Sequence, residues 1–286
     1  MMKQKKTTRE EYQKCVNTVI DYINLHLGEE IDVKSLAKIS HFSSFYFHRI
    51  MTAFLGEPIG TFIVRTRTEA AARLLRYSDL PVADIAYRIG YSTPSSLSKV
   101  FKQFYGISPI EYRNNKNFVI MKPAMIRPDL ELQKEIRELP ARNVIYIRLF
   151  GDYKLNDYCG TWLRLFQFAE EHNLRANDPS PLCIYHDDPK VTPVEKLRTD
   201  VCMVLPVAAI PKGDIGSKQL PAGRYATFLY KGPYSNLQAV YDTIYGKYLP
   251  EMECTLREEA SAERYLNDPS RTAPEDLLTE IYIPVE

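Results

Sequence analysis

The sequence predicts a multidomain protein of α and α+β class, with an all-α double helix-turn-helix domain followed by an α+β domain of two strand–helix–strand–strand repeats. Its 286 residues exceed the size of one typical domain. Apolar residues recur at every third or fourth position up to residue 116, whereas short strand-like runs dominate after residue 128. Both parts of the chain also contain an internal duplication, which chance periodicity rarely produces.

The domain boundaries are predicted from these changes of pattern. Residues 8–115 are expected to form the helical domain, and residues 129–286 the α+β domain. The segment 116–128 between them mixes Asn, Lys and Pro and keeps neither period, so we predict that it is a linker.

Capping residues divide the first domain into separate helices. Asp32 is expected to cap a short helix, and Ser43 or Ser44 to cap the next one. Pro58 stands where a first helical turn tolerates proline, so a longer helix is expected from there through Arg76.

The helical pattern then repeats. The segment LAKISHFSSFYFHRIMTAFLG aligns with IAYRIGYSTPSSLSKVFKQFYG, with one extra residue in the second turn. Ala37 matches Ala86, and Gly56 matches Gly106. We therefore expect two similar units, each with a short helix, a turn and a longer second helix.

Charge is distributed unevenly along the chain. Residues 1–116 hold 17 Lys and Arg against 11 Asp and Glu, whereas residues 117–286 hold 20 against 25. A basic first part suggests contact with a polyanion, although an excess of this size is also common on domains that bind none.

Composition argues against several classes of protein. The chain has no apolar run of the roughly 18 residues that a membrane-spanning helix needs, and no apolar segment follows its basic start, as a secretory signal requires. The five cysteines are scattered, without a CxxC pair or a histidine at ligand spacing. We therefore expect a cytoplasmic protein with no disulfide framework, metal or cofactor.

The second half of the chain repeats at a step of 80 residues. IYHDDPKVTPVEKLRTDVCMVLPV parallels RYLNDPSRTAPEDLLTEIYIPV, so that Asp200 matches Glu280. Strand-like runs are NVIYIRLFG, VCMVLPV, YATFLYKG and TEIYIPV, and helical stretches lie near 157–173 and 234–249. Two such units predict antiparallel sheets related by a pseudo-two-fold axis.

The second helix of each helical unit has an apolar side and a polar side, as a helix that reads DNA requires. The expected core residues are Phe47, Ile50, Met51 and Phe54 in the first unit, and Leu97, Val100, Phe101 and Phe104 in the second. The residues expected to face outward are Phe45, His48 and Arg49, and Ser95, Ser96, Ser98 and Lys99. Candidate phosphate contacts are Arg65, Arg67, Arg73, Arg76, Arg88, Lys102 and Arg113. The alternative is an all-α domain that binds no DNA, because short helices joined by tight turns are common.

The segment IAYRIGYSTPSSLSKVFKQFYGISPIEYR resembles the signature of the AraC family of transcription regulators. The resemblance covers about 100 residues and implies seven helices that bind double-stranded DNA, with RNA polymerase as a partner. Carried over by position, the base-contacting residues are Phe45, His48, Arg49, Pro94, Ser95, Ser98 and Lys99. Pro94 and His41 depart from the family pattern, and Pro94 also removes a hydrogen-bond donor.

Glu280 stands out in the last predicted strand, where alternation places it on the face opposite Ile281. A carboxylate among aromatic side chains would attract a cation, whereas the alternative is an exposed strand glutamate. The segments GRYATFLYKGPYSNLQAVYDTIYGKYLP, ERYLNDP and LLTEIYIPV resemble the gyrase-inhibitor-like (GyrI-like) effector-binding domain. That resemblance implies a pocket for a small amphipathic or cationic effector, centred on Glu280, with Tyr146, Trp162, Tyr185 and Tyr230 as candidate walls.

Two other functions stay open for the second domain. It could hydrolyse small compounds, with Glu280 and a tyrosine as the reacting pair, although no nucleophile–His–acid order, metal cluster or glycine-rich phosphate loop supports catalysis. It could instead be a protein-interaction module. We expect a regulator that is not an enzyme.

Overall fold

The structure is a computed structural model that describes residues 2–40, 42–114, 126–127, 129–174, 181–252, 254–257 and 259–286. Most of the predicted linker, residues 116–125 and 128, therefore lies outside the described residues, as does His41. The chain divides into two compact units: Met1–Met121 with Asp188–Lys196 and Pro211–Gly216, and Lys122–Asp187 with Leu197–Ile210 and Ser217–Glu286.

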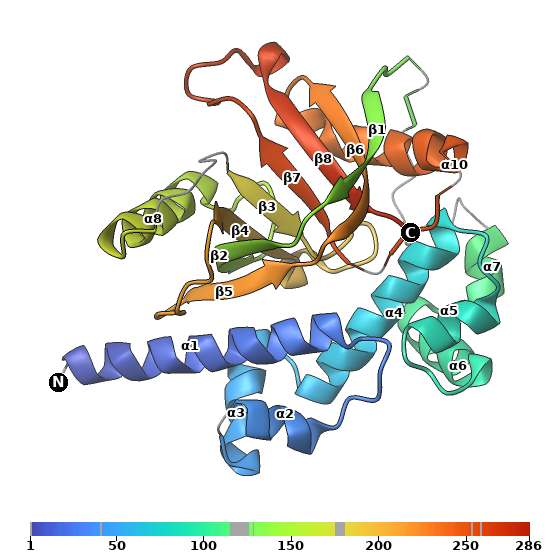
Figure 1. The fold of residues 1–286 in the computed structure, drawn as a ribbon. Helices are drawn as coiled ribbons and strands as arrows, with labels where there is room; N and C mark the ends of the chain where they lie inside the picture. The colour runs from blue at the N-terminus through green and yellow to red at the C-terminus, as the bar shows by residue number, and fades with distance from the viewer. Residues whose placement is uncertain are drawn as a thin grey trace. The chain divides into compact units, whose positions relative to one another are not determined.

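The first unit contains the predicted helices (Figure 1). They are α1 (Met2–Leu25), α2 (Val33–Ile39), α3 (Ser44–Leu55), α4 (Ile59–Tyr77), α5 (Val82–Arg88), α6 (Pro94–Tyr105) and α7 (Pro109–Asn114). The Asp32 side chain accepts hydrogen bonds from the amides of Lys34 and Ser35, as a capping residue should. Both α3 and α6 end at a glycine in the left-handed region, Gly56 at φ 67° and Gly106 at φ 76°, which confirms the duplicated pattern. None of the described helices has the length and apolar content needed to cross a bilayer.

Each helix-turn-helix unit has its own hydrophobic core. Phe47 and Met51 on α3 are fully buried, and so are Leu97 and Phe101 on α6, as predicted. The prediction for Phe104 is wrong, because 41% of it is exposed. The core position is taken by the next residue, Tyr105, because its ring packs against Phe101 at 4.7 Å between centroids.

Three arginines predicted to neutralise phosphates hold the helices together instead. Arg65 is 5% exposed and lies between two carboxylates, bonding Glu57 at 2.9 Å and Glu69 at 3.0 Å. Arg67 donates to the carbonyl oxygen of Leu27 at 2.9 Å. Arg113 donates to the carbonyl of Leu80 at 2.5 Å. Arg67 and Arg113 thus bond carbonyl oxygens in the segments after α1 and α4, and Arg65 balances buried charge. These bonds make the three guanidinium groups poor candidates for phosphate contacts.

The second unit is built on one eight-stranded sheet in the order β1-β6-β8-β7-β3-β4-β2-β5. The strands are β1 (Gln133–Leu139), β2 (Arg142–Phe150), β3 (Leu182–Tyr185), β4 (Arg198–Leu205), β5 (Ile215–Leu220), β6 (Gly223–Lys231), β7 (Ser261–Tyr265) and β8 (Leu278–Pro284). The two predicted repeats are therefore β2-α8-β3-β4 and β6-α9-β7-β8, and they join through antiparallel pairing of β3 with β7. The sheet is continuous across the pseudo-two-fold axis.

Each repeat also has an additional first strand, which the sequence did not predict. β1 pairs with β6 of the second repeat, and β5 lies next to β2 of the first repeat. The repeats thus exchange their first strands, and this exchange ties the two halves of the sheet together. The arrangement is shown in Figure 1.

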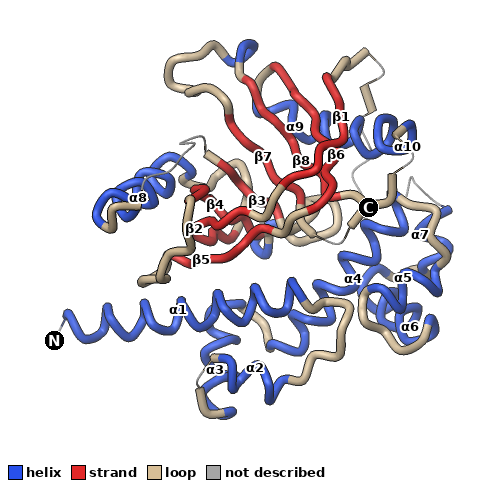
Figure 2. Tube along the Cα trace, viewed as in Figure 1, coloured by secondary structure: helices blue, strands red, loops and turns tan. Residues whose placement is uncertain are grey.

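Helices of the second unit cover one face of this sheet (Figure 2). They are α8 (Tyr158–Glu171), α9 (Leu237–Thr243), a π-helical turn (Ile244–Tyr248) and α10 (Leu249–Glu251), with 3₁₀ turns at Tyr234–Asn236 and Pro274–Asp276. A further 3₁₀ turn, Val194–Lys196, belongs to the first unit. Tyr158 on α8 lies beside Tyr185 of β3, and Tyr241 on α9 lies beside Glu263 of β7. Tyr185 and Glu263 belong to the same sheet face, so both helices cover that face.

Substituting Arg65 should destabilise the helical unit without acting on DNA directly. Arg65→Ala removes a cation buried between two carboxylates, and we expect it to lower the free energy of unfolding by about 3–5 kcal/mol. Urea denaturation of the full chain measures this change. Arg49→Ala is the matched control, since Arg49 is exposed and its loss should change stability by no more than about 0.5 kcal/mol. Equal stability of Arg65→Ala and wild type would contradict the structural role.

Candidate functional site

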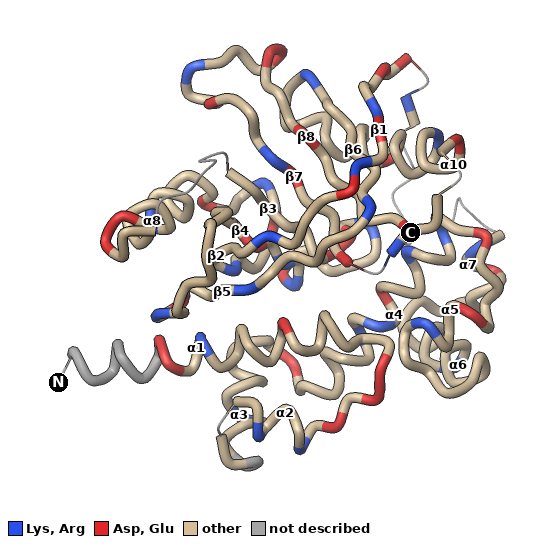
Figure 3. Tube along the Cα trace, in the orientation of Figure 1, with Lys and Arg blue, Asp and Glu red and all other residues tan. Residues whose placement is uncertain are grey.

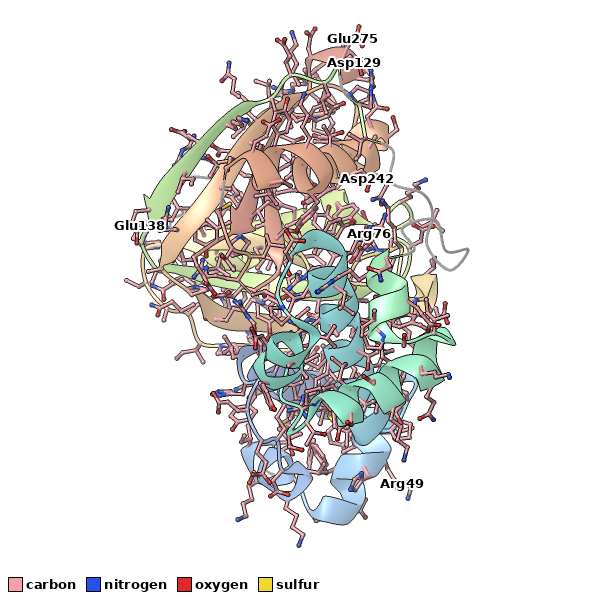
Figure 4. All side chains as sticks on the ribbon, turned by 90° about the vertical axis from the view of Figure 1, so that its right-hand side faces the viewer. Arg49, Arg76, Asp129, Glu138, Asp242 and Glu275 are labelled. Atoms are coloured by element: carbon pink, nitrogen blue, oxygen red, sulfur yellow. The ribbon has the colours of Figure 1, made fainter. Side chains whose placement is uncertain are left out.

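In the first helix-turn-helix, the second helix, α3, presents polar side chains to the solvent. His48 and Arg49 are both exposed on α3, and Figure 4 labels Arg49 on this helix. Phe45 lies in the first turn of α3, but its side chain is outside the described residues. His48 and Arg49 therefore occupy the outward positions that the sequence predicted for them.

In the second helix-turn-helix, the second helix, α6, exposes fewer of its polar side chains to the solvent. Ser95 and Lys99 are exposed, whereas Ser98 is half-buried and donates its hydroxyl to the carbonyl of Pro94 at 3.0 Å. Ser96, also predicted to be exposed, is half-buried, and its amide donates to the capping Thr93 hydroxyl at 3.1 Å. Only two of the four predicted polar residues on α6 therefore face the solvent fully.

The five residues predicted to bind an effector do not form one site. Tyr146 pairs with Cys202 in the ladder, and the same face continues across β3 and β7 to Glu280. Tyr185 and Tyr230 belong to the opposite face, because side chains alternate along each strand. A single small molecule cannot contact both faces of a continuous sheet.

On the face of Tyr146, Asp200 is fully buried in a cluster of basic groups. Arg148 donates two hydrogen bonds to its carboxylate, at 2.7 and 2.8 Å. Lys218 lies at 2.5 Å and the His186 ring nitrogen at 2.9 Å. Burial alone would raise the pKa of Asp200, but these basic neighbours hold it well below its usual range. The side chain of His186 is 8% exposed, and burial lowers its pKa despite the Asp200 carboxylate.

Glu280 occupies the matching position in the second repeat and is also paired. Arg137 donates to it at 2.6 Å, Arg264 lies at 3.5 Å, and the Tyr282 hydroxyl bonds its second oxygen. Figure 3 marks positions of basic and acidic residues on the traces of β1 and β7. A cationic ligand at Glu280 would have to compete with two guanidinium groups.

On the helix-covered face, Glu263 is a buried carboxylate without a cation among the described residues. It is 3% exposed. The Tyr265 hydroxyl donates to it at 2.5 Å, and Tyr241 lies close by. Burial raises the pKa of Glu263 to about 7, because the hydrogen-bonding tyrosines offset only part of the desolvation. Chemically, the site can accept a cation or exchange a proton near neutral pH.

Tyrosines surround Glu263 in a pseudo-symmetric pattern. The Tyr185 and Tyr265 hydroxyls lie 2.8 Å apart across the β3–β7 junction. Tyr153 meets Tyr185 edge-on at 4.9 Å, and Tyr234 meets Tyr265 edge-on at 5.2 Å. Cys183 of the first repeat pairs in register with Glu263, so the two repeats differ most at the carboxylate. Both repeats thus contribute tyrosines to the site, and the second repeat contributes the carboxylate.

The remaining predicted wall residues occupy different surroundings. Tyr230 is 3% exposed, and its hydroxyl donates to the carbonyl of Pro233 at 3.3 Å. Trp162 is half-buried on α8, one helical turn after Tyr158, and stacks on Phe166 at 5.9 Å. Its buried indole N–H has no hydrogen-bond partner among the described residues. The Tyr185 hydroxyl bonds the Tyr265 hydroxyl, which in turn donates to Glu263. Among the described residues, Tyr185 is therefore the predicted wall residue that is linked to Glu263 by hydrogen bonds.

A π-helical turn begins three residues after Tyr241. In it the amide of Leu249 donates to the carbonyl of Ile244, five residues earlier. Such turns are rare and recur at functional sites. The helix that brings Tyr241 to Glu263 is therefore irregular immediately after the site.

Sequence analysis missed Glu263 because β3 and β7 are only four and five residues long. Strands this short do not display a clear period. The signal that could have found Glu263 is the repeat itself, since extending the match of Tyr185 with Tyr265 two residues backwards places Glu263 opposite an apolar cysteine.

Two family patterns match this chain. Residues 133–286 match the GyrI-like small molecule binding domain. The chain belongs to the GyrI-like family. Residues 36–115 match a helix-turn-helix domain, and this first part is of AraC type. Both resemblances found in the sequence are thereby confirmed.

The curated relatives match the AraC-type part of the chain. An uncharacterized HTH-type transcriptional regulator, YbfP of Bacillus subtilis, is 33% identical over 102 residues, which is 36% of this chain and 35% of YbfP. The regulatory protein SoxS of Salmonella typhimurium is 29% identical over 103 residues, which is 36% of this chain and 96% of SoxS. The F1 operon positive regulatory protein of Yersinia pestis is 32% identical over 137 residues, 46% of this chain and 45% of that protein.

Within the described residues, no group of three His, Cys, Asp or Glu side chains is placed to hold a metal ion. Two of the five cysteines, Cys183 and Cys202, are buried, whereas Cys159 is exposed.

The raised pKa of Glu263 makes stability depend on pH. Between pH 4.5 and about 7 an unfolded glutamate ionises while the buried one does not, so wild-type stability falls as pH rises through that window. Glu263→Gln removes the titration. We expect the unfolding free energy of the variant, relative to wild type, to rise by about 3 kcal/mol from pH 5 to pH 8.5 in urea denaturation. A constant difference between the two proteins would show that Glu263 ionises normally.

Proposed function

We propose that the chain is a sequence-specific DNA-binding transcription regulator whose GyrI-like domain binds a small lipophilic cation at Glu263. Two observations support this proposal. The AraC-type unit exposes His48 and Arg49 on the second helix of a helix-turn-helix. The GyrI-like unit contains a buried carboxylate among tyrosines with no cation paired to it among the described residues.

Arg49 is the residue to which we assign most of the sequence reading. Its guanidinium can donate two parallel hydrogen bonds to O6 and N7 of guanine, a geometry that lysine cannot reproduce. His48 and Lys99 supply further donors, and Phe45 and Ser95 complete the proposed contact set. Ser98 contributes less, because its hydroxyl is already bonded within α6. The names of two relatives, YbfP and SoxS, describe regulators, which supports the proposed role of the domain as a whole.

The effector site is assigned to the helix-covered face. A cation entering beside Glu263 would gain a charge partner and aromatic faces, which favour flat or lipophilic cations. Tyr185 and Tyr265 are the proposed walls, with Trp162 on α8 and Tyr230 on β6 further along the same side. Glu280 and Tyr146 lie on the opposite face, and we assign them to holding the sheet together.

Activation through RNA polymerase is the mode of regulation that we propose. Two DNA-reading units in one chain can place the protein on a promoter without a dimer. The Yersinia pestis relative is named a positive regulatory protein, which favours activation over repression. Transcription in vitro from a selected operator, with and without the cation, tests the sign of the effect.

Arg49 variants test the DNA assignment. Arg49→Ala should lose about 1–3 kcal/mol of specific binding and leave nonspecific affinity nearly unchanged. Arg49→Lys keeps the charge and is the matched control: it should restore the salt dependence but not the base preference. The measurement is competition between operator and random duplexes, after selecting the operator from a random pool. Full specificity in Arg49→Lys would reduce Arg49 to a phosphate contact.

Binding of tetraphenylphosphonium tests the effector assignment. Glu263→Gln should weaken binding at pH 8 by about tenfold or more, because it removes the charge that balances the buried cation. Glu280→Gln is the matched control and should stay within about threefold of wild type. Quenching of intrinsic tyrosine and tryptophan fluorescence follows the titration. Loss of binding in Glu280→Gln instead would place the effector site at Glu280, on the opposite face of the sheet.

The hydrogen bond between Tyr265 and Glu263 favours hydrolysis as a second candidate function. A carboxylate whose pKa lies near 7 can act as a general base at neutral pH. Incubation with activated aryl esters and epoxides tests this. Product formation that disappears in Glu263→Gln would establish catalysis, whereas unchanged substrate would leave binding as the role of this site.

A further inference from the structure

Glu263 is surrounded by groups that are neutral at pH 7. The titratable groups that act on it or respond to its charge are Tyr265 on its own strand, Cys183 and Tyr185 on β3, Tyr241 on α9 and Tyr234 in the preceding turn. On β8 its direct neighbour in register is Ile281. None of these side chains can balance a negative charge.

The other buried acids of the same sheet, Asp200 and Glu280, are paired with basic side chains. Asp200 has Arg148 and Lys218 within hydrogen-bond distance, and Glu280 has Arg137. Each of these carboxylates is buried together with its counter-charge, which is the usual condition for burying an ion. Glu263 is 3% exposed and lacks such a partner among the described residues. Its ionised form is therefore the unfavourable one in the empty site.

The protonated form of Glu263, in contrast, matches the hydrogen-bonding groups around it. A protonated carboxyl has one O–H donor and can still accept from Tyr265, whose hydroxyl bonds its Oε2 atom. The Tyr241 hydroxyl is buried and lies close enough to Glu263 to share a hydrogen bond with it. Its oxygen is an acceptor for the carboxyl proton.

We propose that Glu263 carries a proton while its site is empty and releases it to the solvent when a cationic effector binds. This inference rests on the proposed function and adds regulation by pH to it. The carboxyl O–H bond breaks, both electrons stay on oxygen, and the effector replaces the proton as the positive partner. At no stage does the site bury an unbalanced carboxylate.

The pH dependence of binding follows from this exchange. Because burial raises the pKa of Glu263 to about 7, the empty site is largely protonated below that pH. A cation must then displace a proton, so its affinity rises with pH and levels off above pH 7. A neutral ligand of the same shape displaces no proton and keeps its affinity at low pH. The charge of the preferred ligand thus changes across neutrality.

The test is a titration of the full-length protein with tetraphenylphosphonium, a cation that does not itself ionise, from pH 5.5 to 8.5. Wild type should bind about tenfold more tightly for each pH unit gained below about pH 6.5, and with no further gain above about pH 7.5. Calorimetry at pH 6 in two buffers of different ionisation enthalpy should report the release of nearly one proton per cation. Triphenylphosphine oxide, a neutral ligand of similar shape, should show no such gain.

Two variants test the proposal, and three outcomes would contradict it. Glu263→Gln should bind the cation weakly with no pH dependence, and Glu280→Gln should keep the wild-type profile. Wild-type binding that is independent of pH, or a pH dependence that survives in Glu263→Gln, overturns the proton exchange and leaves the proposed effector site intact. Absence of binding at every pH overturns both.

Discussion

Alternation of side chains along one continuous antiparallel sheet is the constraint on which the second unit depends. Because β3 and β7 pair across the pseudo-two-fold axis, each face of the sheet runs unbroken through both repeats. One face collects Asp200, Glu280 and their arginines. The other collects Glu263 and the tyrosines under α8 and α9. The sheet therefore separates the acids that are paired with basic side chains from Glu263, which has no basic partner among the described residues.

The exchange of first strands explains how the arginines reach their acids. β1 belongs to the first repeat but pairs with β6 of the second, which brings Arg137 to Glu280, 143 residues away along the chain. Arg148 lies on β2 beside Asp200 of β4, 52 residues away. Buried ion pairs of this kind are costly to break on one side, so they favour the correct register between repeats. Glu263 has no such pair among the described residues, and we therefore proposed it as the acid that binds a ligand.

A similar division of roles holds in the helical unit. Arg65, Arg67 and Arg113 point to carboxylates or carbonyl oxygens inside the domain. Arg49, in contrast, is exposed on α3. The basic character of the first part of the chain therefore overstates the charge that is available to DNA.

The sequence by itself determined the local features of this protein: the seven helices of the first unit with their caps at Asp32 and Gly106, the four longer strands, and the repeat that relates Asp200 to Glu280. Periodicity and capping depend on residues that are close in the chain, so they can be predicted from the sequence. The tertiary structure decided which buried acid lacks an arginine partner among the described residues, which arginines are buried, and that Tyr105 rather than Phe104 packs in the core. These depend on partners that are remote in the chain or on the exact rotation of a helix, and neither leaves a local pattern.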